Sequence, residues 1–158
     1  EYWSYDETLK KWEGSSKIEY TLNTKGDILG YLDYGWENDN WMASKKSENQ
    51  FDDNGNKILT HSCLIEDEGS LKDFTETEYG YDDQGRQNMS AYYTYSNGSK
   101  KGSLKSEYVF NDKDQEIEKT TYQWSTFDNN WEGKKKETTT YNENDDIASI
   151  KEDAFDVF

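Results

Sequence analysis

Proline is missing from this chain, and cysteine is represented by Cys63 alone. The absence of proline excludes Pro-rich linkers and polyproline recognition motifs. A single cysteine excludes an internal disulfide, so cysteine usage does not indicate a redox compartment. Long hydrophobic runs are also missing, and we therefore expect no membrane insertion. Positive charge is scarce, because 18 Lys and Arg stand against 34 Asp and Glu, for a net charge of −16. Nucleic acid is not an expected partner, since it would repel such a chain.

Aliphatic residues are also few. Only 31% of the residues are hydrophobic, and the mean hydropathy is −1.28. Low hydropathy with high net charge is typical of disorder. The 6 Trp, 13 Tyr and 6 Phe indicate the opposite, since disordered chains are poor in aromatic residues and aromatic side chains bury large areas. The composition predicts a folded protein with a thin core, and 158 residues suit one domain.

One pattern of about thirty residues occurs five times. Each copy has an aromatic residue or Leu, then two or three polar residues rich in Asp and Asn, then Gly or Asp at a turn. The leading residues are Leu22, Phe51, Tyr81, Phe110 and Tyr141, which are 29, 30, 29 and 31 residues apart. A repeat this regular indicates an array of one supersecondary unit. We expect one repeat domain over 1–158, with a partial repeat at 2–28, repeats at 29–58, 59–88, 89–117 and 118–147, and a partial repeat at 148–158.

Alternation with period two runs on both sides of each turn. Ser106, Tyr108 and Phe110 share one side of an expected strand, and Tyr34 and Trp36 share one side of another. Such alternation is typical of half-buried strands, and Asp-Asn-Gly turns are typical of hairpins. The fold class that we predict is all-β: an antiparallel meander of about 9–10 strands, forming a curved elongated sheet or an open sandwich with an aromatic inner face. We expect Gly55 and Gly85, and Asp114 and Asp145 in the same column, to adopt positive φ.

The segment Tyr79–Arg86 reads Tyr-Gly-Tyr-Asp-Asp-Gln-Gly-Arg. It resembles the Tyr-x-Tyr-Asp-x-x-Gly-Arg core of YD repeats in large secreted bacterial shell and toxin proteins. A second motif combines Tyr122, Trp124, Trp131 and Tyr141. It resembles the repeat of small secreted or cell-envelope proteins of unknown function in gut bacteria, which are built from hairpin repeats. The resemblance implies a secreted, periplasmic or cell-surface location. Because Trp3 and Tyr5 resemble Tyr34 and Trp36, the chain opens inside a repeat, and we expect that a signal peptide has been removed.

Tryptophans are the best candidates for a ligand-binding site. Trp12, Trp41 and Trp131 flank the variable loops on one side, and Trp36 and Trp124 flank them on the other. Aromatic platforms on a sheet suit sugar rings, whose C–H faces stack on indole. The alternative is that these side chains form the core of a sheet that has few aliphatic residues, and their periodicity favours this interpretation.

Three other patterns carry possible chemistry. His61 and Cys63 share a strand face, but they occupy packing columns of the repeat, so a catalytic pair is disfavoured. Alternating oxygen side chains at the turns suggest calcium loops, but the sixth-position Gly and twelfth-position acid are missing, so we predict no metal. Acidic runs suggest glycosidase carboxylates, although a solvated face explains them better. The calcium candidates are Asp52, Asn54 and Asn56, with Asn142, Asn144 and Asp146; the acidic runs are Glu66–Glu68 and Asp145–Asp146.

The sequence therefore predicts a protein that is not an enzyme and needs no cofactor. We expect a secreted or envelope-associated scaffold or recognition module whose partner is a protein or a glycan. A carbohydrate-binding module that uses the loop tryptophans is the first alternative, and a hydrolase is the less favoured one.

Overall fold

The structure, a computed structural model, describes residues 1–66 and 69–155. These residues form β-strands and turns and contain no α-helix, so no helix of the described chain is long and apolar enough to span a membrane. The strands are β1 (Tyr2–Asp6), β2 (Lys11–Leu22), β3 (Ile28–Glu37), β4 (Asn40–Phe51), β5 (Lys57–Ile65), β6 (Leu71–Tyr81), β7 (Gln87–Ser96), β8 (Ser99–Phe110), β9 (Glu116–Ser125), β10 (Asn130–Tyr141) and β11 (Ile147–Ala154).

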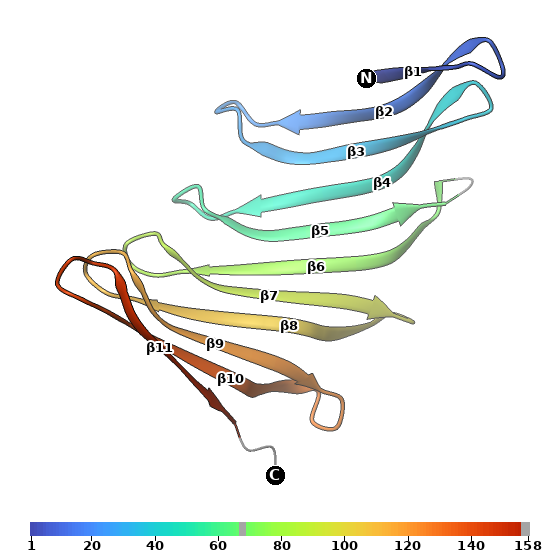
Figure 1. The fold of residues 1–158 in the computed structure, drawn as a ribbon. Coiled ribbons are helices and arrows are strands. Elements are labelled where there is room, and N and C mark those ends of the chain that lie inside the picture. The colour runs from blue at the N-terminus through green and yellow to red at the C-terminus, as the bar shows by residue number, and fades with distance from the viewer. Residues whose placement is uncertain (67–68, 156–158) are drawn as a thin grey trace. The chain divides into compact units, whose positions relative to one another are not determined.

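The strand order follows the chain from β1 to β11, as expected for a meander (Figure 1). The all-β prediction is confirmed, and the sheet has eleven strands where nine or ten were expected, because the two partial repeats contribute three strands. The chain divides into two compact units, Glu1–Glu76 and Thr77–Phe158, which are described separately below. Within each unit the described strands form a single layer (Figure 1).

The repeat turns adopt one geometry at all five positions. In the second copy, the Asp52 carboxylate accepts hydrogen bonds from the backbone N–H groups of Asn54 at 3.0 Å and Asn56 at 2.8 Å. The residue three positions after the Asx residue then adopts positive φ, with 87° at Gly55 and 61° at Asp114. Gly85 and Asp145 follow the same rule, which confirms the prediction from the sequence. Asx side chains and a left-handed residue together close these hairpins.

The register assigns the aromatic residues to both faces of the sheet. Tyr34 lies opposite Lys17 across β2 and β3, whereas Tyr31 lies opposite Tyr20. Directly paired residues project on the same side, so Tyr34 and Trp36 lie on the Lys17 face, and Ile18 and Tyr20 lie on the other. The expectation of a single aromatic inner face is therefore wrong in this detail. The turn sets the register, and the register decides which alternating residues of one strand share a face with those of the next.

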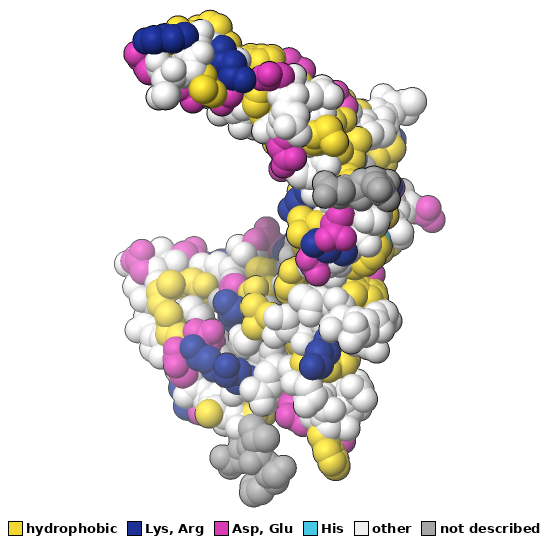
Figure 2. All heavy atoms as spheres, turned by 90° about the vertical axis from the view of Figure 1, so that its right-hand side faces the viewer, with side chains coloured by type: hydrophobic (Ala, Val, Ile, Leu, Met, Phe, Trp, Pro, Cys, Tyr) yellow, Lys and Arg dark blue, Asp and Glu magenta, His cyan; other side chains and the backbone are white. Residues whose placement is uncertain are grey.

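The core is small, as the composition predicts. Among the described residues, the buried ones are Gly30, Ser47, Cys63, Ala91, Tyr93, Ser106 and Thr120. Most aromatic and aliphatic side chains are half-buried or exposed, and hydrophobic side chains reach the surface among charged ones (Figure 2). A single-layer sheet has solvent on both faces, so contacts between neighbouring side chains on one face replace a conventional core.

Candidate functional site

A lysine–glutamate–tyrosine ladder lines the Lys17 face of unit 1. Lys17 Nζ lies 2.8 Å from Glu19 Oε1 and 4.3 Å from the centroid of the Tyr34 ring, and the Tyr34 hydroxyl donates to Glu19 Oε2 at 2.5 Å. The hydrogen bond from Lys17, followed by that from Tyr34, lowers the pKa of Glu19. The same bond to Glu19, together with burial, raises the pKa of Tyr34. These three side chains satisfy one another.

The ladder recurs in unit 2. Lys105 Nζ lies 2.6 Å from Glu107 Oε1 and 4.8 Å from the Tyr122 ring, and the Tyr122 hydroxyl donates to Glu107. Burial and the bond to Glu107 raise the pKa of Tyr122 to about 12. Burial opposes ionisation of Glu107, but hydrogen bonds from Lys105 and Tyr122 outweigh it and hold the pKa of Glu107 below its ordinary value. A carboxylate with a lowered pKa cannot act as a general acid near neutral pH.

In unit 1, two tryptophans of β3 and β4 cover a glycine of β2. Trp36 and Trp41 are paired across the hairpin of β3 and β4, with ring centroids 5.1 Å apart and planes at 74°. Both rings lie over Gly14 of β2, where an added Cβ would lie 2.6 Å from Trp36 and 2.7 Å from Trp41. Trp3 of β1, which lies opposite Gly14, completes the cluster at 4.9 Å from Trp36. We call a glycine covered in this way a glycine seat, and we call two aromatic rings that are paired across a hairpin a ring pair.

Unit 2 contains a second ring pair on a second glycine seat. Trp124 and Trp131 are paired across β9 and β10, at 5.1 Å and 84°, and lie over Gly102 of β8. An added Cβ on Gly102 would lie 2.6 Å from Trp131. Tyr93 takes the position of Trp3, and its hydroxyl accepts a hydrogen bond from Trp131 Nε1 at 3.3 Å. A single ring, Phe155, lies over Gly133 of β10 in the same way, 3.0 Å from an added Cβ.

The first hairpin carries a ring pair that has no glycine seat. Tyr5 and Trp12 are paired across β1 and β2, with centroids 5.4 Å apart and planes at 64°. In the other two pairs the seat belongs to the strand that precedes the hairpin. The Tyr5–Trp12 pair lies on β1 and β2, the first two strands of the described sheet, and Trp12 is 63% exposed while Tyr5 is 44% exposed.

The five tryptophans predicted from the sequence thus fall into two groups. Trp36, Trp41, Trp124 and Trp131 are half-buried and perpendicular within their pairs, an arrangement that leaves no flat platform of coplanar rings. Trp12 is exposed, and it is separated by pairing and position from the other four. Whether any of these residues binds a ligand stays a prediction.

The glycine seats were not predicted from the sequence, although the sequence contains a signal for them. Gly14, Gly102 and Gly133 all stand eight residues before the leading residue of their repeat, Ala43 occupies the same column, and Asp73 interrupts it in the third copy. A column of small residues beside columns of tryptophan indicates that large rings cover a strand closely.

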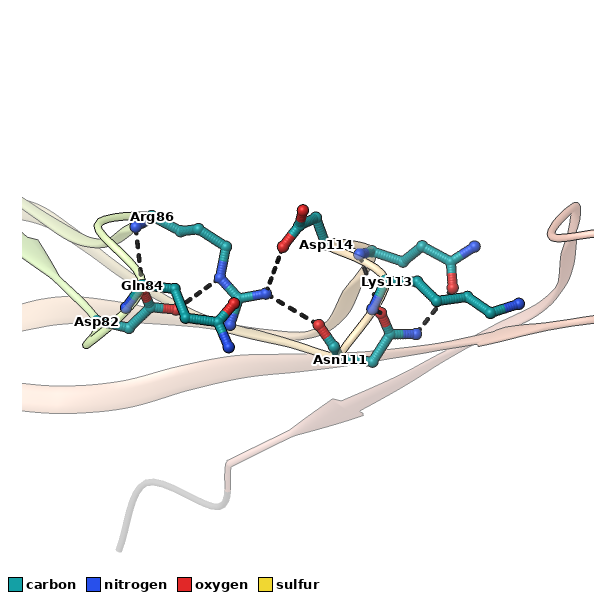
Figure 3. Close-up of polar contacts among 7 residues, drawn as sticks. Asp82, Gln84, Arg86, Asn111, Lys113 and Asp114 are labelled. Carbon is teal, nitrogen blue, oxygen red and sulfur yellow. Dashed lines mark hydrogen bonds and ion pairs between the residues drawn. The ribbon is translucent and has the colours of Figure 1, made fainter.

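The turns also bond one another (Figure 3). Arg86 donates from Nε to the Asp82 carboxylate at 2.7 Å, and its Nη1 reaches the next turn, 2.9 Å from the carbonyl oxygen of Asn111 and 2.7 Å from Asp114. Lys113 continues the series, because its Nζ lies 2.5 Å from Asp145. Burial alone would raise the pKa of Asp82. Hydrogen bonds from the backbone and guanidinium of Arg86 outweigh this effect, so the pKa of Asp82 lies below its ordinary value.

Hydrogen bonds within the turns engage several of the side chains proposed as calcium ligands. Both carboxylate oxygens of Asp52 accept hydrogen bonds from within its turn, the second from Asn56 Nδ2 at 3.0 Å. Those bonds, of which the one from the Asn56 side chain is the largest cause, lower the pKa of Asp52. In the last turn the Asn142 side-chain oxygen accepts from Asn144 N at 2.9 Å and Asp146 N at 3.0 Å. Within the described ranges, no group of three or more His, Cys, Asp and Glu residues has metal-site geometry.

The other candidates are placed as follows. Cys63 is 7% exposed and lies opposite Lys46, while the His61 ring stacks on Phe74 at 5.5 Å and 29°. This stacking is the packing role that the repeat columns predict. Of the proposed glycosidase carboxylates, Asp67 and Glu68 lie outside the described residues, Glu66 pairs with Lys72, and Asp145 pairs with Lys113.

Comparisons with known proteins give the fold but no family. No protein-family model matches the chain, and no curated protein matches it. A solved structure of a protein of unknown function from Bacteroides fragilis is similar, with a TM-score of 0.62 and 15% sequence identity over 79% of this chain and 92% of that one. At this identity the likeness shows a shared β-meander only.

Proposed function

We propose that this protein is a non-catalytic, secreted or envelope-associated β-repeat module that acts as a scaffold or recognition surface for another protein. The observation that carries the proposal is the ladder geometry. In both units the lysine, glutamate and tyrosine side chains of the ladder bond one another instead of converging on a cleft, and the glutamates and tyrosines among them have shifted pKa values. Functional sites usually concentrate perturbed groups around a concave pocket.

The grooves on the sheet support this proposal. A groove of about 210 Å³ over β3 and β4 is lined by Gly30, Ser47 and Glu48, among others. Its volume is below the roughly 300 Å³ at which small-molecule pockets begin. A groove of about 390 Å³ over the turns of unit 2 is lined by Asn111, Lys113 and Asp145, which already bond within and between turns.

A carbohydrate-binding module is the second candidate, and the exposure of Trp12 favours it. One exposed indole stacks on a sugar, but the perpendicular pairs leave no extended platform, so this candidate reduces to a site at the first hairpin. The secreted location rests on the resemblance of the repeat to secreted and envelope proteins of bacteria. Fractionation of cells that express the full-length gene tests it.

One experiment separates the function classes. The purified protein is panned against a phage-displayed random peptide library, spotted on a glycan array, and assayed with generic glycoside and ester substrates. Enriched peptides that bind the protein with saturation support the recognition module. Glycans whose binding is lost in Trp12→Ala support the second candidate, and saturable turnover of any substrate contradicts both.

A further inference from the structure

We propose that the groove over β3 and β4 binds one tyrosine side chain of a basic partner protein, with the ring beneath Lys46 and the hydroxyl hydrogen-bonded to Glu48. This inference rests on the proposed recognition function and names the chemistry of the contact. A single aromatic side chain that fills a pocket often carries much of the binding energy of an interface.

The groove exists because Gly30 has no side chain. Gly30 is paired with Thr21 of β2 and with Glu48 of β4, and the groove of about 210 Å³ is lined by all three and by Lys46. A Cβ at Gly30 would lie 2.5 Å from the backbone oxygen of Ser47, so the close approach of β3 and β4 requires glycine. The other complete repeats have larger side chains in this column: Leu59, Met89 and Glu118. The volume is small for a whole ligand and suits one side chain.

The two ladders show how this sheet holds a tyrosine. In each ladder one carboxylate oxygen of the glutamate pairs with the lysine, and the other oxygen accepts a hydrogen bond from the tyrosine hydroxyl. The lysine also lies over the tyrosine ring, which is a favourable cation–π contact. The sets are Lys17, Glu19 and Tyr34 in unit 1, and Lys105, Glu107 and Tyr122 in unit 2.

Lys46 and Glu48 form the same pair without a tyrosine. Lys46 Nζ lies 2.9 Å from Glu48 Oε1, but the residue opposite Lys46 in the tyrosine column is Cys63. Within the part of the chain that the structure describes, no aromatic ring lies beneath Lys46, and the second carboxylate oxygen of Glu48 accepts no hydrogen bond. The Lys46 side chain is 41% exposed, whereas that of Lys17 is 17% exposed. Both binding groups are therefore open to a ring from another molecule.

The chemistry of the groove selects tyrosine among side chains. Phenylalanine has no donor for Glu48, and an acidic side chain would be repelled by that carboxylate. Indole has a donor, but it is larger than phenol, and both ladders hold the smaller ring. Aromatic rings also cover Gly14 and Gly102 elsewhere in the sheet. A second copy of this chain is disfavoured as the partner, because two chains of net charge −16 repel each other, whereas a basic protein is attracted.

The test uses two capped peptides of equal charge, Gly-Lys-Tyr-Lys-Gly and Gly-Lys-Phe-Lys-Gly, and 4-methylphenol as the free side chain. Backbone amide shifts of the full chain give both the dissociation constant and the location of each probe. We expect the tyrosine peptide to bind saturably with shifts in β3 and β4, and more tightly than 4-methylphenol. The phenylalanine peptide should bind roughly tenfold more weakly, because it loses a hydrogen bond to a charged acceptor.

Protein variants test the two contacts separately. Glu48→Gln should weaken the tyrosine peptide roughly tenfold and remove most of the preference for tyrosine over phenylalanine. Lys46→Met should weaken both peptides by about two- to fivefold, because the cation–π contact is lost. The controls are Asp53→Asn and Lys25→Met, which make the same changes of charge at exposed turn positions of unit 1. Both controls should leave the preference for tyrosine unchanged.

Completion of the ladder within the chain provides a further test. Cys63→Tyr places a tyrosine opposite Lys46, as in the two ladders, so its hydroxyl should take the open oxygen of Glu48 and compete with the tyrosine peptide. We expect this variant to bind the peptide at least roughly tenfold more weakly. Melting curves identify any loss of folding, and the exposed Glu48→Gln change keeps the proposal testable if Cys63→Tyr unfolds.

Several outcomes would overturn the proposal: no binding of the tyrosine peptide, equal binding of the two peptides, amide shifts outside β2–β5, or no effect of Glu48→Gln. Binding of 4-methylphenol as tight as that of the peptide would assign the groove to small phenols, and self-association through the groove would assign it to a second copy. Library peptides whose binding survives Glu48→Gln, alongside failure of the tyrosine peptide, would refute this groove and leave the proposed recognition function standing.

Discussion

Adding one methyl group at a glycine seat should destabilise the sheet, although alanine is ordinarily the better residue in a strand. In Gly102→Ala the new Cβ would lie 2.6 Å from the Trp131 ring and closer still to Trp124. These neighbours are parts of rigid rings that also pack on each other at 5.1 Å, so they cannot rotate away singly. One or both indoles must leave the seat.

Two opposing effects set the magnitude. Overpacking typically costs about 1–3 kcal/mol, and replacement of glycine reduces the entropy of the unfolded chain, which stabilises the protein by about 0.4–1 kcal/mol. The net prediction is a loss of about 1–2 kcal/mol. Gly14→Ala should behave alike in unit 1, because its Cβ would meet Trp36 and Trp41 at 2.6 and 2.7 Å.

Urea unfolding followed by circular dichroism and tryptophan fluorescence measures the effect. Gly35→Ala is the matched control, because Gly35 lies in a strand with nothing within 4 Å of an added Cβ. It should be neutral or stabilising by up to about 1 kcal/mol. Pairing Gly102→Ala with Trp131→Val should cost less than the sum of the two single changes. Equal effects of Gly102→Ala and Gly35→Ala, or strict additivity in the double variant, would refute the packing argument.

Four further predictions concern the turns and the ladder. Gly55→Val should destabilise by about 1 kcal/mol or more through its φ of 87° alone, since an added Cβ there meets nothing within 4 Å, and urea unfolding measures it. Arg86→Met should lower the unfolding midpoint more than Lys113→Met, because Arg86 bonds two turns and Lys113 forms one exposed ion pair; equal midpoints would contradict the turn ladder. Tyr122 should ionise near pH 12 in ultraviolet titration. Because its folded pKa lies above the unfolded value, its stabilising effect is complete below about pH 10 and is lost between pH 10 and 12, and Glu107→Gln should lower that pKa. Melting curves in calcium and in chelator should coincide, and a clear shift would assign the acidic turns to metal binding.

The repeat allowed much of the fold to be predicted, because each turn needs a left-handed residue three positions after an Asx residue. Gly55 and Asp145 could therefore be assigned positive φ from spacing alone. The face on which each aromatic lies could not be predicted in this way. Alternation within Ile18–Leu22 and within Tyr31–Trp36 gives two sets per strand, but only the register across the turn decides which sets meet. The position of the ring pairs could not be predicted for a related reason. Trp36 of β3 lies over Gly14 of the neighbouring strand β2, and the repeat columns suggest this contact only once the order of the strands is known.

The high aromatic content has a physical explanation in the single-layer sheet. A sheet with solvent on both faces has no interior, so stability has to come from side chains that lie flat along neighbouring strands. Tryptophan suits this requirement, because it covers a glycine on the next strand and still meets water at its edge. Four of the five rings that would suggest a ligand platform are therefore used by the sheet itself: Trp36, Trp41, Trp124 and Trp131. Trp12 differs from these rings, because it is paired with Tyr5 across β1 and β2 and is 63% exposed.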